Sequence, residues 1–311
     1  MTLSTGAKWF AASFTFIITI VAGLVFMASD TISANDIYHI TRQIRVGLLE
    51  IEEVQHVQDE APAYLPFNRQ PRHVIQKTRD MLLRINVLLK RAGLESEYIE
   101  VTPITHITDK IVAKQLDHLL QATTRLRTKH NLPTEFGQEV EPHFGKSITD
   151  VYASLQVVEK MLEALGVPIT SPNEAFQFAV IVRDDIQFIM HNRFHMCDDM
   201  SPEHAKDKNA ADVYYYLYTV LGEIHEMTRR EFSHHVPPNL HVPQLKRPPI
   251  SEEDVIDLLD QTIADVGAMK HSMGMSRVSG RGKPVEKKTH TDVYNLIGSM
   301  DHALKCRLER T

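Results

Sequence analysis

The chain has 311 residues, of which 43% are hydrophobic and 24% are charged. It is therefore long enough for two ordinary domains, and its composition excludes a chain that is disordered as a whole. A formal net charge of −6 and an isoelectric point near 6.3 give no electrostatic reason for nucleic acid to be a partner.

The first stretch of the chain has the pattern of an export signal. Lys8 is followed by an uncharged apolar run from Trp9 to Ala28, and small or polar residues then lead to Ala34. This order is typical of a signal peptide, with the best cleavage point after Ala34. A run of about 20 apolar residues can also span a membrane. Residues 1–34 are thus predicted to be either a cleaved signal peptide or a retained anchor. The predicted location, for a bacterial source, is the periplasm or the periplasmic side of the inner membrane.

Apolar residues or threonines recur through the rest of the chain at spacings that place them along one side of an α-helix. The pattern predicts an all-α fold of eight amphipathic helices, each of about 18–22 residues. The eight periodic segments are 37–51, 74–88, 112–126, 151–165, 175–189, 213–227, 255–269 and 293–304.

Six of these segments are preceded by a hydroxyl or amide residue with an acid three positions later. This spacing predicts a capping box, in which each of the two side chains satisfies a free backbone N–H at the start of the helix. The six pairs are Ser33 and Asp36, Ser147 and Asp150, Ser171 and Glu174, Asn209 and Asp212, Ser251 and Asp254, and Thr289 and Asp292.

The motif Lys-x-x-Thr-Asp-Val-Tyr occurs twice, at Lys146–Tyr152 and at Lys288–Tyr294, where it begins the fourth and the eighth segment. Equivalent segments of the two halves lie about 140 residues apart, which indicates an internal repeat. We therefore predict two four-helix units, residues 35–167 and 168–311. The long proline-containing connections, such as 61–71 and 236–249, are predicted to run back along the helices as extended chain.

One candidate metal site lies after the fifth helix. His191 and His195 are spaced so that a helix could present both imidazoles to a zinc ion, and the Cys197 thiolate would be a third ligand. The alternative is chance, because a chain with 17 histidines places some of them close together. No Cys-x2-Cys or His-Glu-x2-His pattern accompanies them, so the sequence predicts no cofactor.

The two cysteines, Cys197 and Cys306, are also a candidate disulfide. A bridge requires their Cα atoms to lie within about 7 Å. This arrangement is easy only if the fifth and eighth helices run parallel and adjacent, and the sequence leaves the pairing open.

Four tyrosines cluster in the sixth segment, at Tyr214–Tyr216 and Tyr218. Tyrosines suit a binding surface because they have an apolar body and a polar tip, so Tyr215, Tyr216 and Tyr218 are candidates for such a surface. Tyr214 occupies a position that is also tyrosine in three other helices, which favours packing against an incoming loop.

Acidic pairs such as Asp184 with Asp185 are expected on a solvated helix face. No catalytic or nucleotide-binding motif is present, so the chain is predicted not to be an enzyme. The leading hypothesis is an exported, non-catalytic helical scaffold that binds an envelope protein through protein–protein contacts and is compatible with a homo-oligomer. The alternative is a periplasmic sensory domain that binds a small molecule or metal and works with a membrane partner. Membrane contact is expected only through an uncleaved N-terminal segment.

Overall fold

The computed structural model describes residues 32–55, 68–99, 107–133, 142–168, 170–193, 204–231, 233, 237, 239–275, 277 and 285–308. These residues form an all-helical fold, as predicted, and contain eight helices that match the eight periodic segments, with α5 ending one residue before its segment does. In chain order the helices are α2 (Ala34–Gln55), α3 (Pro71–Arg91), α4 (Asp109–Lys129), α5 (Ile148–Ala164), α6 (Pro172–Arg193), α7 (Ala210–Glu231), α8 (Glu252–Ser272) and α9 (His290–Leu308).

The predicted side-chain caps form at α2, α5, α7, α8 and α9. At α5 the Ser147 hydroxyl accepts from the Asp150 backbone N–H (3.3 Å), and the Asp150 carboxylate accepts from the Ser147 backbone N–H (2.8 Å). The start of α6 differs, because the carboxylate of Glu174 accepts from Arg84 of α3 (3.2 Å). The corresponding contacts elsewhere join Ser33 with Asp36, Asn209 with Asp212, Ser251 with Asp254, and Thr289 with Asp292.

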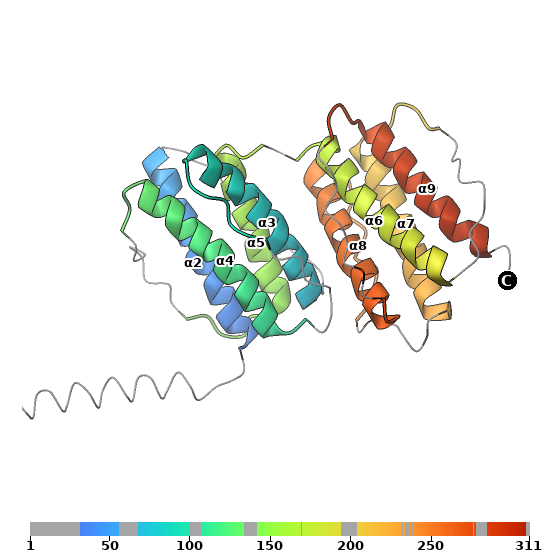
Figure 1. The fold of residues 1–311 in the computed structure, drawn as a ribbon, viewed down its shortest axis with the longest axis horizontal. Helices are drawn as coiled ribbons and strands as arrows, with labels where there is room; N and C mark the ends of the chain where they lie inside the picture. Colours follow the sequence, from blue (N-terminus) through green and yellow to red (C-terminus); the bar gives the residue numbers. More distant parts are fainter. Residues whose placement is uncertain are drawn as a thin grey trace, which may run out of the picture.

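The helices are arranged as two four-helix bundles side by side (Figure 1). Around the first bundle the order is α2, α4, α3 and α5, and around the second it is α6, α8, α7 and α9. The successive helices α2 and α3 therefore lie diagonally across the first bundle, as do α4 and α5, whereas α3 and α4 are adjacent. Each bundle encloses its own hydrophobic core, with Leu116 and Leu155 in the first and Leu217 and Leu259 in the second.

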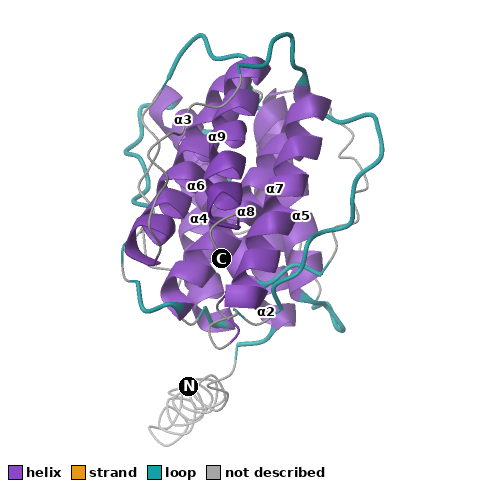
Figure 2. Cartoon of the chain, turned by 90° about the vertical axis from the view of Figure 1, so that its right-hand side faces the viewer, coloured by secondary structure: helices purple, strands orange, loops and turns teal. Residues whose placement is uncertain are grey.

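The four helices of the first bundle all run in the same direction. Contacts join the starts of α2, α3 and α5, and another contact joins the ends of α2 and α4. A helix of about 20 residues is about 30 Å long, so a chain that begins each helix at the same end must return over that distance. Described loop segments, teal in Figure 2, run along the sides of the bundles. The joining contacts are Lys146 N to Asn35 Oδ1 (2.8 Å), Arg69 N to Thr149 Oγ1 (3.0 Å) and Gln55 Nε2 to His130 Nε2 (3.3 Å).

The same contacts recur at equivalent positions of the second bundle. The backbone N–H of Lys288 donates to Asn173 Oδ1 (2.8 Å), and that of Lys208 donates to Thr291 Oγ1 (3.0 Å). Lys208 also lies over the ring of Tyr294 (4.7 Å), as Arg69 lies over that of Tyr152 (4.3 Å) in the first bundle. The second bundle is therefore also parallel in these helices. The predicted division of the chain at residues 167 and 168 into separate units stays a prediction.

The bundles meet where α3 packs against α8. Arg72 near the start of α3 pairs with Asp265 late in α8, whereas Lys77 pairs with the earlier Asp257. The two helices are therefore antiparallel, and the second bundle is inverted relative to the first. The side chains of α8 are buried almost all round, which differs from the predicted amphipathic helix, because α3 covers the side that would otherwise face solvent.

No helix among the described residues is long and apolar enough to cross a membrane. Most of the predicted signal or anchor, residues 1–31, lies outside the described residues. Its last part, from Ile32 to Ala34, leads directly into α2.

Replacing Ser147 by alanine is expected to lower the free energy of unfolding by about 1 kcal/mol, the usual cost of removing an N-terminal helix cap. The Ser147 hydroxyl and backbone also lower the pKa of Asp150. A carboxyl group whose pKa is lower in the folded protein stabilises the fold at pH values above its unfolded pKa. This stabilisation is lost as the pH falls through the folded pKa. The loss in Ser147→Ala should therefore be larger at neutral pH than near pH 2, as measured by chemical denaturation. Thr128→Ala, which removes an exposed hydroxyl inside α4, is the control; an equal loss in both variants would contradict the capping role.

Candidate functional site

The junction between the bundles contains a cluster of buried polar side chains on one side of α3. Their spacing of three and four residues places them along one face of the helix. The cluster extends along the length of α3 and meets acids of α8 and polar residues of α5. Its α3-side members are Arg69, Arg72, His73, Gln76, Lys77, Asp80 and Arg84, all less than a tenth exposed.

Lys77 is the centre of this cluster. Its ammonium lies 2.6 Å from Glu159 of α5 and 2.8 Å from Asp257 of α8. The Tyr152 hydroxyl donates to Asp257 (3.3 Å), and the Gln156 amide also donates to it. Burial opposes the charge of Lys77, but the two carboxylates outweigh it and raise the pKa of Lys77 well above its usual value. The Lys77 ammonium therefore remains charged inside the junction.

Asp265 of α8 is the second junction acid. The Arg72 Nε lies 2.7 Å from its Oδ1, and the His73 Nε2 lies 3.0 Å from the same atom. The His73 Nδ1 accepts from the Gln70 backbone N–H (3.0 Å), so Nε2 carries the ring hydrogen and donates to Asp265. Burial lowers the pKa of His73 to about 4. His73 is therefore a neutral hydrogen-bond donor at physiological pH.

The third part of the cluster surrounds Arg84. Its guanidinium lies 3.1 Å from Asp80, 3.4 Å from Glu159 and 3.2 Å from Glu174 of α6. Burial raises the pKa of both Glu159 and Glu174 to about 7. Burial beside Asp80 also raises the pKa of Asp260 well above its usual value. Several acids are thus partly or wholly neutral, which lowers the negative charge that the arginine and lysine must balance.

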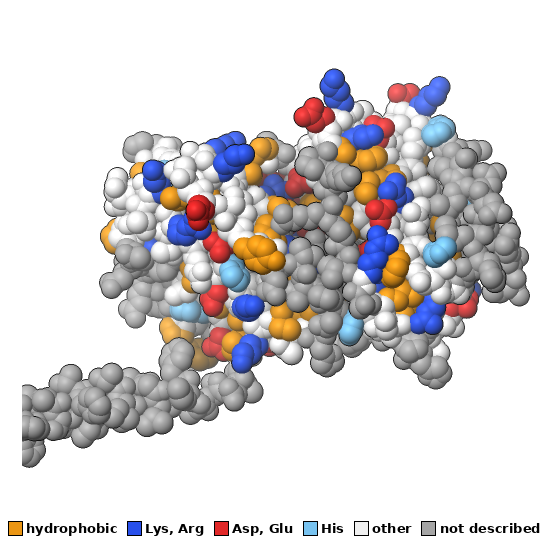
Figure 3. Space-filling model, in the orientation of Figure 1, with side chains coloured by type: hydrophobic (Ala, Val, Ile, Leu, Met, Phe, Trp, Pro, Cys, Tyr) orange, Lys and Arg blue, Asp and Glu red, His pale blue; other side chains and the backbone are white. Residues whose placement is uncertain are grey.

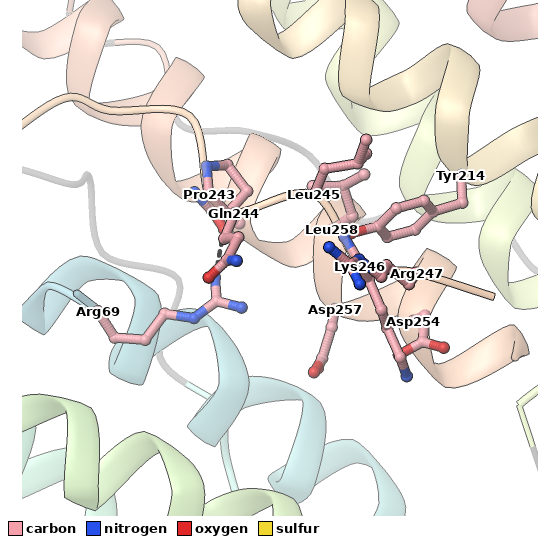
Figure 4. A pocket seen from close by; sticks show the side chains of 11 residues that line it. Arg69, Tyr214, Pro243, Gln244, Leu245, Lys246, Arg247, Asp254, Asp257 and Leu258 are labelled. Carbon is pink, nitrogen blue, oxygen red and sulfur yellow. Dashed lines mark hydrogen bonds and ion pairs between the residues drawn. The ribbon is translucent and has the colours of Figure 1, made fainter. Parts of the chain in front are cut away.

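A pocket of about 340 Å³ opens at the Arg69 end of the cluster (Figure 4). Arg69 faces the loop from Pro243 to Arg247 across this pocket, and Asp254 and Asp257 of α8 form its floor as drawn. The ammonium of Lys246 lies 2.5 Å from Asp254, and Arg69 donates to Gln261. These charges largely balance one another, so the pocket suits a small polar molecule more than a strongly charged one.

The tyrosines that are predicted to form a binding surface are instead half-buried. The hydroxyls of Tyr215 and Tyr218 donate to the carbonyls of Lys246 (3.5 Å) and Pro243 (3.0 Å). Tyr216 donates to Asp301 of α9 (2.8 Å). Tyr214 accepts from the Lys246 backbone N–H (3.3 Å), so it contacts the incoming loop. These positions do not test a binding role for Tyr215, Tyr216 and Tyr218, which stays a prediction.

The predicted metal site and disulfide fall largely outside the described residues. His191 is exposed near the end of α6, but His195 and Cys197 lie outside the described part of the chain. The backbone of Cys306 is in α9, whereas its side chain is not described. No group of three or more potential metal ligands is found among the residues that were described. Both pairings therefore stay predictions.

One sequence interpretation is wrong. Asp185 is not on a solvated face, because it is 2% exposed and lies 2.5 Å from the ammonium of Lys270 in α8. The helical period shows which residues share a side of α6, but it does not show that α8 covers the side with Asp185.

Sequence reasoning also missed the whole junction cluster. A signal was present, because α8 contains four aspartates among apolar residues that occupy every side of the helix. A helix that is apolar all round is buried, so its acids required buried partners. Comparison of the chain with protein-family models, with curated proteins and with solved structures found no match.

Replacing Lys77 by methionine should lower the free energy of unfolding by about 3–5 kcal/mol, because the partner carboxylates are left buried without their cation. Chemical denaturation of the full chain would measure this loss. Lys90→Met is the matched control, since Lys90 is exposed on the same helix. A loss below about 1 kcal/mol, typical of surface substitutions, would show that the Lys77 pair is not essential to the junction.

Replacing Glu174 by glutamine should change how stability depends on pH. The pKa of Glu174 is raised from 4.5 to about 7. Between these values the folded protein holds a proton that the unfolded chain has lost, so this group makes stability fall as the pH rises. Glutamine does not titrate, and the stability of Glu174→Gln relative to the unmodified protein should therefore increase from about pH 5 to about pH 8. Glu226→Gln, on the exposed surface, is the control, and a decrease in Glu174→Gln would contradict the raised pKa.

Proposed function

We propose that the chain is an exported, non-catalytic helical scaffold that binds another protein of the cell envelope. The observation that supports this most is the junction cluster. Lys77 pairs with Glu159 and Asp257, and Arg72 pairs with Asp265, between the bundles. These pairs serve to fix the two bundles as one body. An enzyme would need comparable groups directed at a substrate.

The matched contacts of the two bundles support an origin by duplication of a four-helix unit. Arg69 and Lys208, and likewise Asn35 and Asn173, make the same bonds at equivalent positions. Repetition of a plain structural unit extends a surface without adding a reactive group, which is how repeat scaffolds are built.

The start of α2 supports a retained anchor over a cleaved signal. Ser33 caps this helix through Asp36, and Asn35 accepts from the backbone of Lys146. Cleavage after Ala34 would remove the cap and place a charged amino terminus in the first helical turn, where the helix dipole disfavours positive charge.

Tyr98 is the residue on which we expect a partner to bind. Its side chain is 74% exposed, although the segment that carries it is held in place. The Asn86 side chain of α3 donates to the Glu97 carbonyl (3.0 Å) and accepts from its N–H (2.6 Å). Leu83, one turn earlier on α3, is also exposed. A fixed, exposed tyrosine is typical of the anchors at protein interfaces.

Replacing Tyr98 by lysine should abolish capture of that partner. The full chain with an affinity tag would be incubated with detergent-solubilised envelope, and the bound proteins would be compared by mass spectrometry. A protein retained by the unmodified chain and by Leu49→Lys, an exposed apolar control on α2, should be absent with Tyr98→Lys. Recovery of no protein above background from the unmodified chain would count against the scaffold function.

The pocket in Figure 4 favours the alternative, a sensory domain that binds a small molecule. It lies between the two bundles, where a ligand that binds Arg69 and the loop at Lys246 would contact both. Elemental analysis of the purified chain tests the metal version, which requires stoichiometric metal after dialysis.

A further inference from the structure

The α7 and α9 surface of the second bundle is equivalent to the surface that α8 covers on the first bundle. Arg69, Lys77 and Tyr152 line the covered surface, which we call the first groove. Lys208, Tyr216 and Tyr294 occupy the equivalent positions of the α7/α9 surface, the second groove. Lys208 and Tyr294 reproduce the contact between Arg69 and Tyr152. The two grooves thus have similar residues at equivalent positions, and in the first groove these residues already contact α8.

In contrast to the first groove, the second groove is open among the described residues, where no helix packs across it. Gln156, Lys77 and Asp80 are buried in the first groove, whereas the equivalent Gly298 and Tyr216 are only partly buried and Thr219 is exposed. A pocket of about 340 Å³ remains there, lined by Tyr216, Tyr294, Asp301 and Lys305 among others.

The charge of the second groove is reversed at its centre. Tyr216 replaces Lys77, and Glu223 replaces Arg84, while Asp301 keeps the acid that Glu159 provides in the first groove. Lys305 lies 2.8 Å from Asp301 and 3.6 Å from Glu223 but is half exposed, and Lys208 is engaged with Tyr294. Where the first groove presents Lys77 to Asp257, the second presents Asp301 and Glu223. Burial beside Asp301 raises the pKa of Glu223 to about 7, and Lys305 already pairs with both acids.

The helix equivalent to α8 in the first bundle is α4, and its charge is reversed at one position, while Asp117 keeps the acid of Asp260. Lys114 occupies the position of Asp257 and is exposed, as are Asp117 and Gln121 on the same side of α4. A cation at the position of Asp257 matches a groove in which Glu223 and Asp301 stand at the positions of Arg84 and Glu159. At the position of Lys114 the complementarity is therefore kept with opposite signs.

We propose that α4 of a second copy of this chain docks in the second groove, antiparallel to α7, with Lys114 facing Asp301 and Glu223. The contact repeats the packing of α8 on α3 and joins different surfaces of the two copies. Such a head-to-tail contact generates an open row unless the rotation closes a ring. This inference goes beyond the proposed scaffold function and does not depend on the partner bound at Tyr98.

The antiparallel orientation of the two bundles would give every copy in such a row the same orientation relative to a membrane. Because α3 and α8 are antiparallel, each junction inverts the next bundle. Two inversions return a second copy to the orientation of the first. In Figure 1 the α2 and α4 side lies at the left end and α9 at the right end, so that the two surfaces are on opposite ends of one molecule. All copies in the row would then present the start of α2, and the segment before it, on the same side.

Charge exchange between Lys114 and Glu223 tests the proposal. The full chain would be studied in non-ionic detergent by sedimentation over a range of concentrations. Lys114→Glu and Glu223→Lys should each weaken self-association by at least about tenfold, through like-charge repulsion. The double variant, or a mixture of the two single variants, should recover association. Lys90→Glu is the matched control on an exposed surface, and circular dichroism would verify that each variant is folded.

Cross-linking gives a second measurement that does not depend on affinity. A chain with Lys114→Cys and a differently tagged chain with Gly298→Cys should form a mixed disulfide dimer under mild oxidation, above the background from the native cysteines. A chain that stays monomeric at all concentrations, or one whose association the substitutions leave unchanged, would overturn the proposal. Partner capture by Lys114→Glu would still report on the scaffold function separately.

Discussion

The ion pairs of Lys77 with Glu159 and Asp257 are the interaction on which the arrangement of the two bundles depends. A buried charge is costly unless its partner lies in the correct place. Helix α8 therefore has one favourable register against α3, the one that places Asp257 at Lys77. In this register Asp265 meets Arg72 and Asp260 meets Gln76. Two apolar surfaces in the same place would tolerate a shift of one turn. The polar contacts thus set both the antiparallel direction and the register of the junction.

The parallel course of the helices makes this junction possible. Because the helices of a bundle begin at one end, the starts of α3 and α5 lie together, where the Arg69 backbone N–H donates to the Thr149 hydroxyl. Arg69, in the segment before α3, then reaches Tyr152 of α5 and Gln261 of α8. An up-and-down bundle with short loops would leave no such segment to span α3, α5 and α8. The face of the molecule in Figure 3 carries lysines, arginines and acids scattered over both bundles.

What the sequence could predict is what local chemistry determines. The Ser147 and Asp150 pair specifies the start of α5 because capping acts within one helical turn, and apolar spacing specifies the buried side of each helix. Neither signal reports which helix lies on the polar side. Lys77 and Lys90 are both lysines of α3, and the positions of α5 and α8 make one buried and the other exposed. The acids of α8 carried the missing information, since a helix with apolar residues on every side cannot leave four aspartates in solvent.

The helices α4 and α8 occupy equivalent positions in the two bundles. The first groove must therefore bind α8 and exclude α4. Lys114 gives a physical answer. If α4 of another copy entered the first groove, Lys114 would stand where Asp257 stands and would face Lys77 beside Arg84. Two like charges that face each other in a buried site repel strongly. The first groove therefore rejects α4 by the same charge that suits α4 to the acids of the second groove. The difference between Lys77 and Tyr216, and that between Asp257 and Lys114, thus separates the contact within the chain from the proposed contact between chains.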